Sequence, residues 1–237
     1  MKKILCSVAL LALAACGQQK PAETAAAPAA PPPAAEPAPA PAPAPVAEKK
    51  AEPLPPLPPA ERAKWYQDCW AAFNVKDWAK FDACWADDAT AEQVDSGMPM
   101  SKGKKDVLDK GAKQFAASFP DATGEHELTL VNGNSIVSIV LVRGTNKGPL
   151  PTPMGELPAT NKKIGMLVGH VIDSTADGRK AQAERFYADA GSQMGQLGMN
   201  PAPHRKLVEV GWPKKEVVIA AGNDVEKANL EIAKKQV

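Results

Sequence analysis

Histidines and cysteines are the residues of this chain with the most chemistry to offer, and the sequence holds few of them. His126, His170 and His204 are scattered, and their spacing does not suggest a metal site. His126 and His204 stand at the ends of predicted elements and look exposed. His170 is the one histidine well inside a predicted strand, which makes it the natural partner in an acid/base pair. Apolar residues flank it on both faces of that strand. The sequence therefore leaves open whether His170 faces a pocket or is a hydrogen-bonded core residue.

Several common chemistries are excluded by missing motifs and by charge. The chain has no G-x-S-x-G, G-x-G-x-x-G or Walker sequence, which argues against a serine hydrolase, a dinucleotide site and a phosphate loop. We expect no cofactor and no metal. A formal net charge of +1 gives no reason to expect nucleic acid as a partner.

Cys69 and Cys84 lie in the part of the chain that can fold, without C-x-x-C spacing or companion histidines. They stand nearly equidistant from the turn Asn74-Val75-Lys76. An antiparallel helix pair would bring them to similar height on facing surfaces. A disulfide requires Cα atoms within about 7 Å. The sequence predicts proximity and leaves open a disulfide or two buried free thiols.

The N-terminus predicts a membrane anchor. A charged start and an apolar core lead to Leu13-Ala14-Ala15-Cys16, which is similar to a bacterial lipobox, where the cysteine is acylated. We therefore expect a signal peptide over 1–15 and lipidation, with palmitate among the acyl chains, at Cys16. Gly17, in place of Asp, favours the outer membrane, with the protein facing the periplasm. Acyl chains at about 0.8 kcal/mol per buried CH₂ would hold the protein firmly.

Residues 16–60 are predicted to form a disordered linker, because this stretch holds most of the 24 prolines, alternating with alanine. Such a chain favours extended polyproline II and cannot bury a core. A ligand for a proline-recognition domain is the alternative.

Periodicity then predicts an α+β domain over 61–205. Helices are expected at 61–73, from Asp77 onward, and at 104–118, the last stopped by Phe119-Pro120-Asp121. Trp70, Trp85 and Phe119 are expected in the core, with stacking of a ligand on Trp70 or Trp85 as the minority interpretation. Ala86-Asp87-Asp88-Ala89 is interpreted as a solvated turn. The period changes to two at 125–131, 135–144, 163–172 and 182–189, which predicts an antiparallel sheet curved around a helix and a pocket.

These elements resemble the SnoaL-like polyketide cyclases of the nuclear transport factor 2-like superfamily, whose fold is a cone of three N-terminal helices packed in a curved antiparallel sheet. The resemblance covers about residues 63–203. It depends on the joint order of short motifs: Phe73-Asn74, Trp85-Ala86-Asp87-Asp88, Phe119-Pro120-Asp121, Gly144-Thr145, the loop 154–160, Asp177-Gly178-Arg179 and Tyr187-Ala188-Asp189. Asn161, Ala183 and Arg185 depart from the family pattern, which puts the substrate in doubt more than the fold.

The resemblance implies that Asp189 is a general acid/base that removes a proton α to a carbonyl, as in ring closure by aldol condensation. A carboxylate at the floor of an apolar cavity would have a raised pKa. Strand alternation puts Tyr187 and Arg185 on the face of Asp189, where a phenol could donate to an enolate and a guanidinium could hold an anion. The alternative is that Asp189 is an exposed helix cap.

The tail over 206–237 includes a helical pattern at 224–233. Either this tail packs on the domain or it begins a truncated second copy, and we expect a loosely attached terminal helix.

Two functions remain open. One is a cofactor-independent cyclase, isomerase or hydrolase of a small carbonyl compound, with Trp70, Phe119 and Arg185 lining its pocket. The other is a non-catalytic envelope module that binds an apolar ligand, a partner or, through its sheet, a second copy.

Overall fold

The computed structural model describes residues 54–235, so the predicted signal peptide, Cys16 and most of the predicted linker lie outside the described residues. The helices are α1 (Pro59–Asn74), α2 (Trp78–Ala83), α3 (Lys104–Asp106), the π-helical turn η1 (Val107–Ala112), α4 (Lys113–Ser118), α5 (Ala190–Gln196) and α6 (Asp224–Lys234). The strands are β1 (Trp85–Gln93), β2 (Ser101–Lys102), β3 (Thr123–Asn132), β4 (Ser135–Thr145), β5 (Leu150–Thr152), β6 (Gly155–Leu157), β7 (Lys163–Ser174), β8 (Ala181–Tyr187) and β9 (Glu216–Ile219).

The predicted helix pair at the start of the domain is confirmed. Pro59 opens α1, where its missing N–H costs nothing. Lys76 takes a left-handed φ of 59° in the turn, and Asp77 caps α2 by accepting a hydrogen bond from the Lys80 amide. Cys69 and Cys84 are joined by a disulfide with a Cα–Cα distance of 6.1 Å. The disulfide ties the middle of α1 to the residue that follows α2.

One helix and one turn differ from the prediction. The helix expected over 104–118 consists of α3, η1 and α4 in succession, so it widens to a π-turn at Val107–Ala112. The segment Ala86-Asp87-Asp88-Ala89, predicted to be a turn, lies in β1. The register of β1 against β8 shifts between Trp85 and Thr90, and both Asp87 and Asp88 point to solvent there. This irregularity hides the two-residue alternation by which a strand is recognised.

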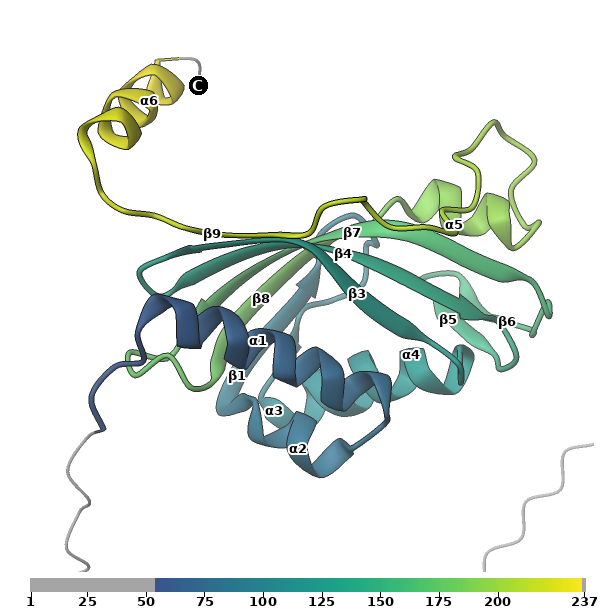
Figure 1. Cartoon of the computed structure of the whole chain (residues 1–237). Helices are drawn as coiled ribbons and strands as arrows, with labels where there is room; N and C mark the ends of the chain where they lie inside the picture. Colours follow the sequence, from purple (N-terminus) through teal and green to yellow (C-terminus); the bar gives the residue numbers. More distant parts are fainter. Residues whose placement is uncertain (1–53, 236–237) are drawn as a thin grey trace, which may run out of the picture. The chain divides into compact units, whose positions relative to one another are not determined.

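The predicted curved sheet is confirmed, with seven strands in the order β2-β1-β8-β7-β4-β3-β9. The neighbouring pairs β8–β7, β7–β4 and β4–β3 are antiparallel, whereas β1 pairs with β8 in parallel. Helices α1 to α4 cover the concave face (Figure 1). The small hairpin β5–β6 forms a separate two-stranded sheet. The fold is thus the α+β cone that the sequence predicted.

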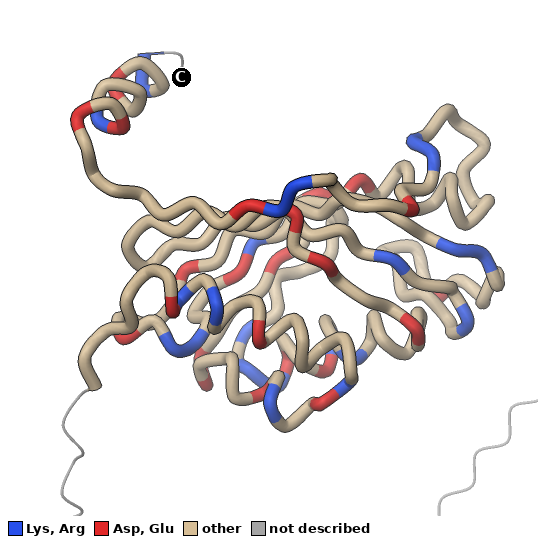
Figure 2. The backbone as a smooth tube through the Cα atoms, in the orientation of Figure 1, with Lys and Arg blue, Asp and Glu red and all other residues tan. Residues whose placement is uncertain are grey.

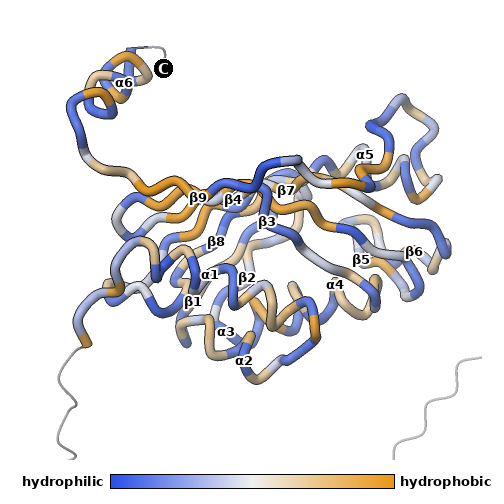
Figure 3. Tube along the Cα trace, in the orientation of Figure 1, coloured by the Kyte–Doolittle hydropathy of each residue, from blue (hydrophilic) through white to orange (hydrophobic). Residues whose placement is uncertain are grey.

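The core lies between the concave face and the helices. Apolar residues follow the central strands (Figure 3), and Ile136, Val140 and Ile172 are completely buried. Phe119 is also completely buried, and its ring lies 4.9 Å from that of Phe115. Phe119 is therefore a core residue, as its apolar surroundings predicted, and does not line an open pocket.

The tail packs on the sheet as far as β9. The Val208 amide donates to the Gly165 carbonyl over 2.9 Å, and β9 pairs in parallel with β3. Between these points the completely buried Glu127 accepts hydrogen bonds from the Trp212 amide and the Lys215 ammonium. Charged residues of the tail and of β3 meet there (Figure 2). β9 lies beyond the boundary expected at residue 205.

The terminal helix α6 begins at the predicted residue 224, with Asn223 as its cap. No residue of α6 is buried. Within residues 54–235, no helix combines the length and apolarity needed to cross a membrane.

Candidate functional site

Polar and aromatic side chains from five elements converge between α1 and the concave face of the sheet. Helix α1 supplies Tyr66 and Trp70, one turn apart on its buried face. His126 comes from β3, Ser138 from β4, His170 from β7 and Glu184 from β8. Strand alternation places these residues inward, since His170 shares its parity with the buried Val168 and Ile172. We call this set of six residues the interior cluster.

His170 and Glu184 form a buried pair at the centre of the interior cluster. The His170 Nδ1 lies 2.8 Å from the Glu184 Oε1, with only 7% and 13% of the two side chains exposed. The carboxylate holds a proton on Nδ1, which leaves Nε2 as the reactive nitrogen of the ring. That Nε2 is buried and has no hydrogen-bond partner. The pair is therefore an imidazole with an orienting carboxylate and a free nitrogen, the arrangement of a general base.

Aromatic rings hold the His170 imidazole in place. Phe186 stacks on it with ring centroids 5.8 Å apart, and Trp70 meets it edge-on at 5.3 Å. The same Trp70 ring lies 6.0 Å from the His126 ring, again edge-on. The Trp70 indole packs directly on β3 at Gly124, where any Cβ would collide with it. Trp70 thus occupies the space between the two imidazoles, and its predicted place in the interior is correct.

His126 is a second imidazole of the interior cluster, partly buried. Its Nδ1 lies 3.0 Å from the Ser138 hydroxyl, which donates in turn to the Leu128 carbonyl, so Ser138 accepts from Nδ1–H. Burial, helped by the nearby His170 and Lys215, lowers the pKa of His126 to about 4. His126 is therefore neutral at pH 7. Its Nε2 is buried without a partner, as an acceptor.

Tyr66 supplies a donor to the same region. Its hydroxyl is buried without a hydrogen-bond partner, and its ring meets that of His126 edge-on at 5.2 Å. Burial, with the neighbouring Glu184 carboxylate, raises the pKa of Tyr66 well above its usual value, and the nearby Trp70 side chain offsets part of that rise. The phenol thus stays protonated at all working pH values. Together with the two imidazole nitrogens, it gives the interior cluster three buried polar atoms without partners.

Asp189 does not have the environment that the resemblance implied. It is the N-cap of α5, where its two oxygens accept from the Ser192 amide and hydroxyl at 2.8 and 2.7 Å. Its side chain is 47% exposed, and the Ser192 hydrogen bonds lower its pKa. An open surface hollow of about 380 Å³ adjoins it, lined also by Asn200, His204 and Arg205. Asp189 is therefore an exposed helix cap, which is the alternative that the sequence left open.

Tyr187 and Arg185 share the face of Asp189, as predicted, but that face is the outer one. Tyr187 is 48% exposed, and Arg185 pairs with Asp173 of β7 at 3.0 Å. Glu184 and Phe186 take the inward positions of β8. The prediction that Tyr187 and Arg185 line a pocket is therefore wrong, because both side chains point away from the helices.

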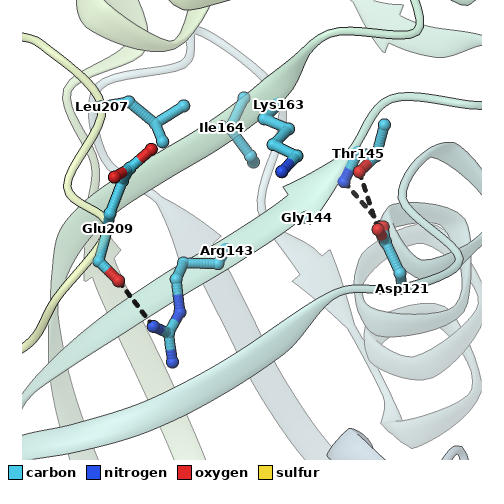
Figure 4. Close-up of a pocket in the computed structure, with 8 residues that line it drawn as sticks. All are labelled: Asp121, Arg143, Gly144, Thr145, Lys163, Ile164, Leu207 and Glu209. Atoms are coloured by element: carbon cyan, nitrogen blue, oxygen red, sulfur yellow. Dashed lines mark hydrogen bonds between the residues drawn. The ribbon is translucent and has the colours of Figure 1, made fainter.

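The other hollow of note lies at the end of β4, under the tail (Figure 4). It measures about 270 Å³ and is lined by Asp121, Arg143, Gly144, Thr145, Lys163, Ile164, Leu207 and Glu209. Two of its charged side chains already have protein partners: Arg143 donates to the Glu209 carbonyl at 2.7 Å, and Asp121 accepts from the Thr145 amide and hydroxyl. This hollow is a weaker candidate than the interior cluster, where polar atoms remain free.

Sequence reasoning found His170 and Trp70 and missed most of their partners. Tyr66 and His126 were available as helix-face and strand residues, but His126 looked like the exposed end of an element. Glu184 stood among Gln182, Arg185 and other polar residues in a strand whose inner face was unknown.

Among residues 54–235, no three His, Cys, Asp or Glu side chains gather as a metal site would require.

Comparison with known proteins agrees with the fold. The SnoaL-like domain family matches residues 66–183, about half of the chain. AclR from Streptomyces galilaeus is 18% identical, with a TM-score of 0.51 over 61% of this chain and 100% of its own. TsrD from Streptomyces laurentii is 17% identical, with a TM-score of 0.51 over 60% and 98%. No curated protein sequence matches significantly. At such identities the solved structures show a common fold.

Proposed function

This chain carries a SnoaL-like domain of the nuclear transport factor 2-like superfamily, and from that premise we propose that its interior cluster performs cofactor-independent proton transfer on a small carbonyl compound. The observation that carries the proposal is that three residues of the interior cluster each hold a buried polar atom without a partner: Tyr66 Oη, His126 Nε2 and His170 Nε2. The function proposed is that of an isomerase or cyclase. It uses His170 in place of Asp189.

The free polar atoms support a ligand site on energetic grounds. A buried donor or acceptor without a partner costs about 1–3 kcal/mol, so three of them are expensive to keep in a structural core. Apolar residues of similar volume would avoid that cost. A ligand with hydrogen-bonding groups would satisfy one or more of these atoms. Trp70 and Phe186 would then hold the apolar part of the ligand.

In the proposed reaction, His170 Nε2 removes a proton from the carbon next to a carbonyl. The C–H bond breaks, an N–H bond forms, and the electron pair moves onto the carbonyl oxygen as an enolate. The neutral Tyr66 hydroxyl donates to that oxygen, while Glu184 stabilises the imidazolium that has formed. Return of the proton to a different carbon gives an isomer. Attack of the enolate carbon on a second carbonyl closes a ring.

The test is α-proton exchange into D₂O, followed by NMR on a panel of small 1,3-dicarbonyl compounds. We expect at least one compound to exchange faster with the wild-type protein, and His170→Gln to lower that rate by about 10²–10⁴. Asp189→Asn is the matched control, since Asn also caps helices, and it should keep the wild-type rate. Equal rates in wild type and His170→Gln would refute the proposed base. A loss in Asp189→Asn would restore the family's acid/base.

A second candidate is a non-catalytic module that binds a small ligand in the same interior. The observation favouring it is the position of Trp70, whose indole fills the space between His126 and His170. On this hypothesis Trp70→Ala opens room for a ligand and strengthens its binding. In the proton-transfer hypothesis Trp70→Ala loosens His170 and lowers exchange. Measuring exchange and ligand-induced stabilisation on this one variant separates the two.

The proposal also places the protein at the cell envelope, through acylation of Cys16. The lipobox-like sequence Leu13-Ala14-Ala15-Cys16 supports this location, and the proline-rich linker would hold the domain away from the bilayer. Incorporation of radiolabelled palmitate in the producing bacterium tests it. We expect label in the wild-type protein and none in Cys16→Ser. Equal labelling of both would contradict the anchor.

A further inference from the structure

Among residues 54–235, three methionines are exposed, and they belong to two hairpin tips. Met98, Met100 and Met154 are 40%, 43% and 98% exposed. The other methionines among the described residues, Met166, Met194 and Met199, are buried or partly buried. Single exposed apolar side chains are ordinary. A group of three thioethers on adjoining turns is a chemical feature in its own right.

The two hairpin tips lie close together. Met98 and Met100 lie in the loop between β1 and β2, and Met154 lies in the turn between β5 and β6. A Cβ at Gly97 would lie 3.9 Å from the Pro153 ring. Met98 follows Gly97 in the sequence, and Met154 follows Pro153. Met98 and Met154 therefore start from backbone segments that lie close together, and Met100 is two residues from Met98 along the chain.

A hydrogen bond from the backbone amide of a methionine also orders each of the two turns. The Met98 amide donates to the Ser96 hydroxyl at 3.0 Å, and the Met154 amide donates to the Thr152 hydroxyl at 3.2 Å. The hydroxyls thus act as local caps that order the two turns. Methionine side chains are long, unbranched and adaptable, so their sulfur atoms can turn toward one another across the contact.

We propose that Met98, Met100 and Met154 form a binding site for a soft monovalent cation, Cu(I) or its redox-stable analogue Ag(I). Neutral thioether sulfur is a poor ligand for Mg²⁺ or Ca²⁺ and a good one for Cu(I). Three thioethers would supply a trigonal set without any charged ligand. This site lies apart from the interior cluster in its residues, and it is independent of the proton transfer proposed above.

The test is a titration of the full chain with Ag(I), using protein labelled with ¹³C at the methionine methyl groups. The chain is used with its signal peptide uncleaved and Cys16 unacylated, and the thiols of Cys6 and Cys16 are alkylated beforehand so that they do not compete for silver. Each of the seven methionines then reports separately on silver binding. We expect the methyl signals of Met98, Met100 and Met154 to shift together and to saturate at one Ag(I) per chain.

Substitution by leucine then isolates the thioethers. The variant Met98→Leu/Met100→Leu/Met154→Leu should bind Ag(I) about 10-fold more weakly or worse, because it keeps the size of the side chains and removes the sulfur ligands. Met194→Leu/Met199→Leu is the control and should bind as the wild type does. Unchanged urea midpoints would show that both variants fold. The proposal is overturned if the three methyl signals do not move together at equimolar silver, or if the triple variant retains wild-type affinity.

Discussion

His170 and Asp189 were both predicted as acid/base residues, and the fold gives them opposite surroundings. The His170 side chain is almost completely buried, is oriented by Glu184, and keeps one ring nitrogen without a partner. The Asp189 side chain is about half exposed, and both of its oxygens already accept hydrogen bonds from Ser192. His170 therefore has a ring nitrogen without a partner in a low-dielectric interior. Asp189 stabilises the N-terminus of α5.

The difference teaches that a family position does not fix a chemical role. A general base needs a lone pair that the fold leaves free, and it gains strength where water is excluded. Asp189 meets neither condition, although its neighbours Tyr187 and Ala188 match the family's motif. His170 meets both. The predictions below change one side of this comparison and use the other as the control.

Loss of the Cys69–Cys84 disulfide is expected to have the largest effect on stability. The bridge closes a loop with a sequence separation of 15, which corresponds to about 3 kcal/mol in the free energy of unfolding. The variant Cys69→Ala/Cys84→Ala should show that loss in urea unfolding. Tyr66 and Trp70 flank Cys69 on α1, so the fluorescence of Trp70 should change as well. Amide exchange at Ser192, beside Asp189, should stay as in the wild type. A loss below about 1 kcal/mol would contradict the entropic argument.

Acid should weaken the interior through His126. Its pKa in the folded protein is about 4, below its ordinary value of 6.5, so the unfolded chain takes up a proton that the folded chain refuses. Stability attributable to His126 is therefore complete above about pH 6.5 and is lost as the pH falls toward 4, by at most about 3 kcal/mol. His126→Gln should remove this part of the pH dependence in urea unfolding. His204→Gln, at an exposed position, is the control. A wild-type slope in His126→Gln would refute the assignment.

Tyr66→Phe removes one of the partnerless atoms without changing the packing of the ring. We expect the free energy of unfolding to rise by up to about 1 kcal/mol, since an unsatisfied buried hydroxyl is removed. Proton exchange should fall by about 100-fold, since the enolate oxygen loses its donor. Tyr187→Phe, on the exposed outer face, should change neither quantity. A destabilised Tyr66→Phe would mean that the hydroxyl has a partner in solution, and the interior cluster would then lose one of its free atoms.

Much of the fold followed from periodicity. The helices of the first half and strands β3, β4, β7 and β8 keep their period over most of their length, so a 3.6-residue or two-residue period identifies them. Strand β1 was missed because its register shift exposes Asp87 and Asp88 side by side. The pairing of β9 with β3 depends on Glu127, a buried carboxylate whose partners lie about 85 residues away along the chain. No local pattern reports such a contact.

The site was harder to predict than the fold, because it depends on which face of a strand points inward. In β8 both faces carry polar residues, so composition does not separate Glu184 from Arg185. The pairing of β8 with β7 decides the matter: Phe186 stands opposite His170, and Glu184 stands opposite the buried Ile172. A shift of one residue would have turned Arg185 and Tyr187 inward. The single-sequence argument had no means to choose between these registers.

Asp189 is expected to give the smallest effect, and one confined to stability. Asp189→Ala should lower the free energy of unfolding by about 1 kcal/mol, because α5 loses its N-cap, whereas Asp189→Asn should keep most of it. The Ser192 hydrogen bonds lower the Asp189 pKa, so the stabilisation is present at neutral pH. It is lost only as the pH falls below the ordinary carboxyl value toward the lower value of the folded protein. That window lies below the one for His126. Urea unfolding of Asp189→Ala at pH 7 and at pH 3 therefore separates the effect of the cap from that of the interior. The difference in free energy of unfolding between wild type and variant should shrink at pH 3. If that difference were unchanged at pH 3, the charged carboxylate would not be the group that caps α5.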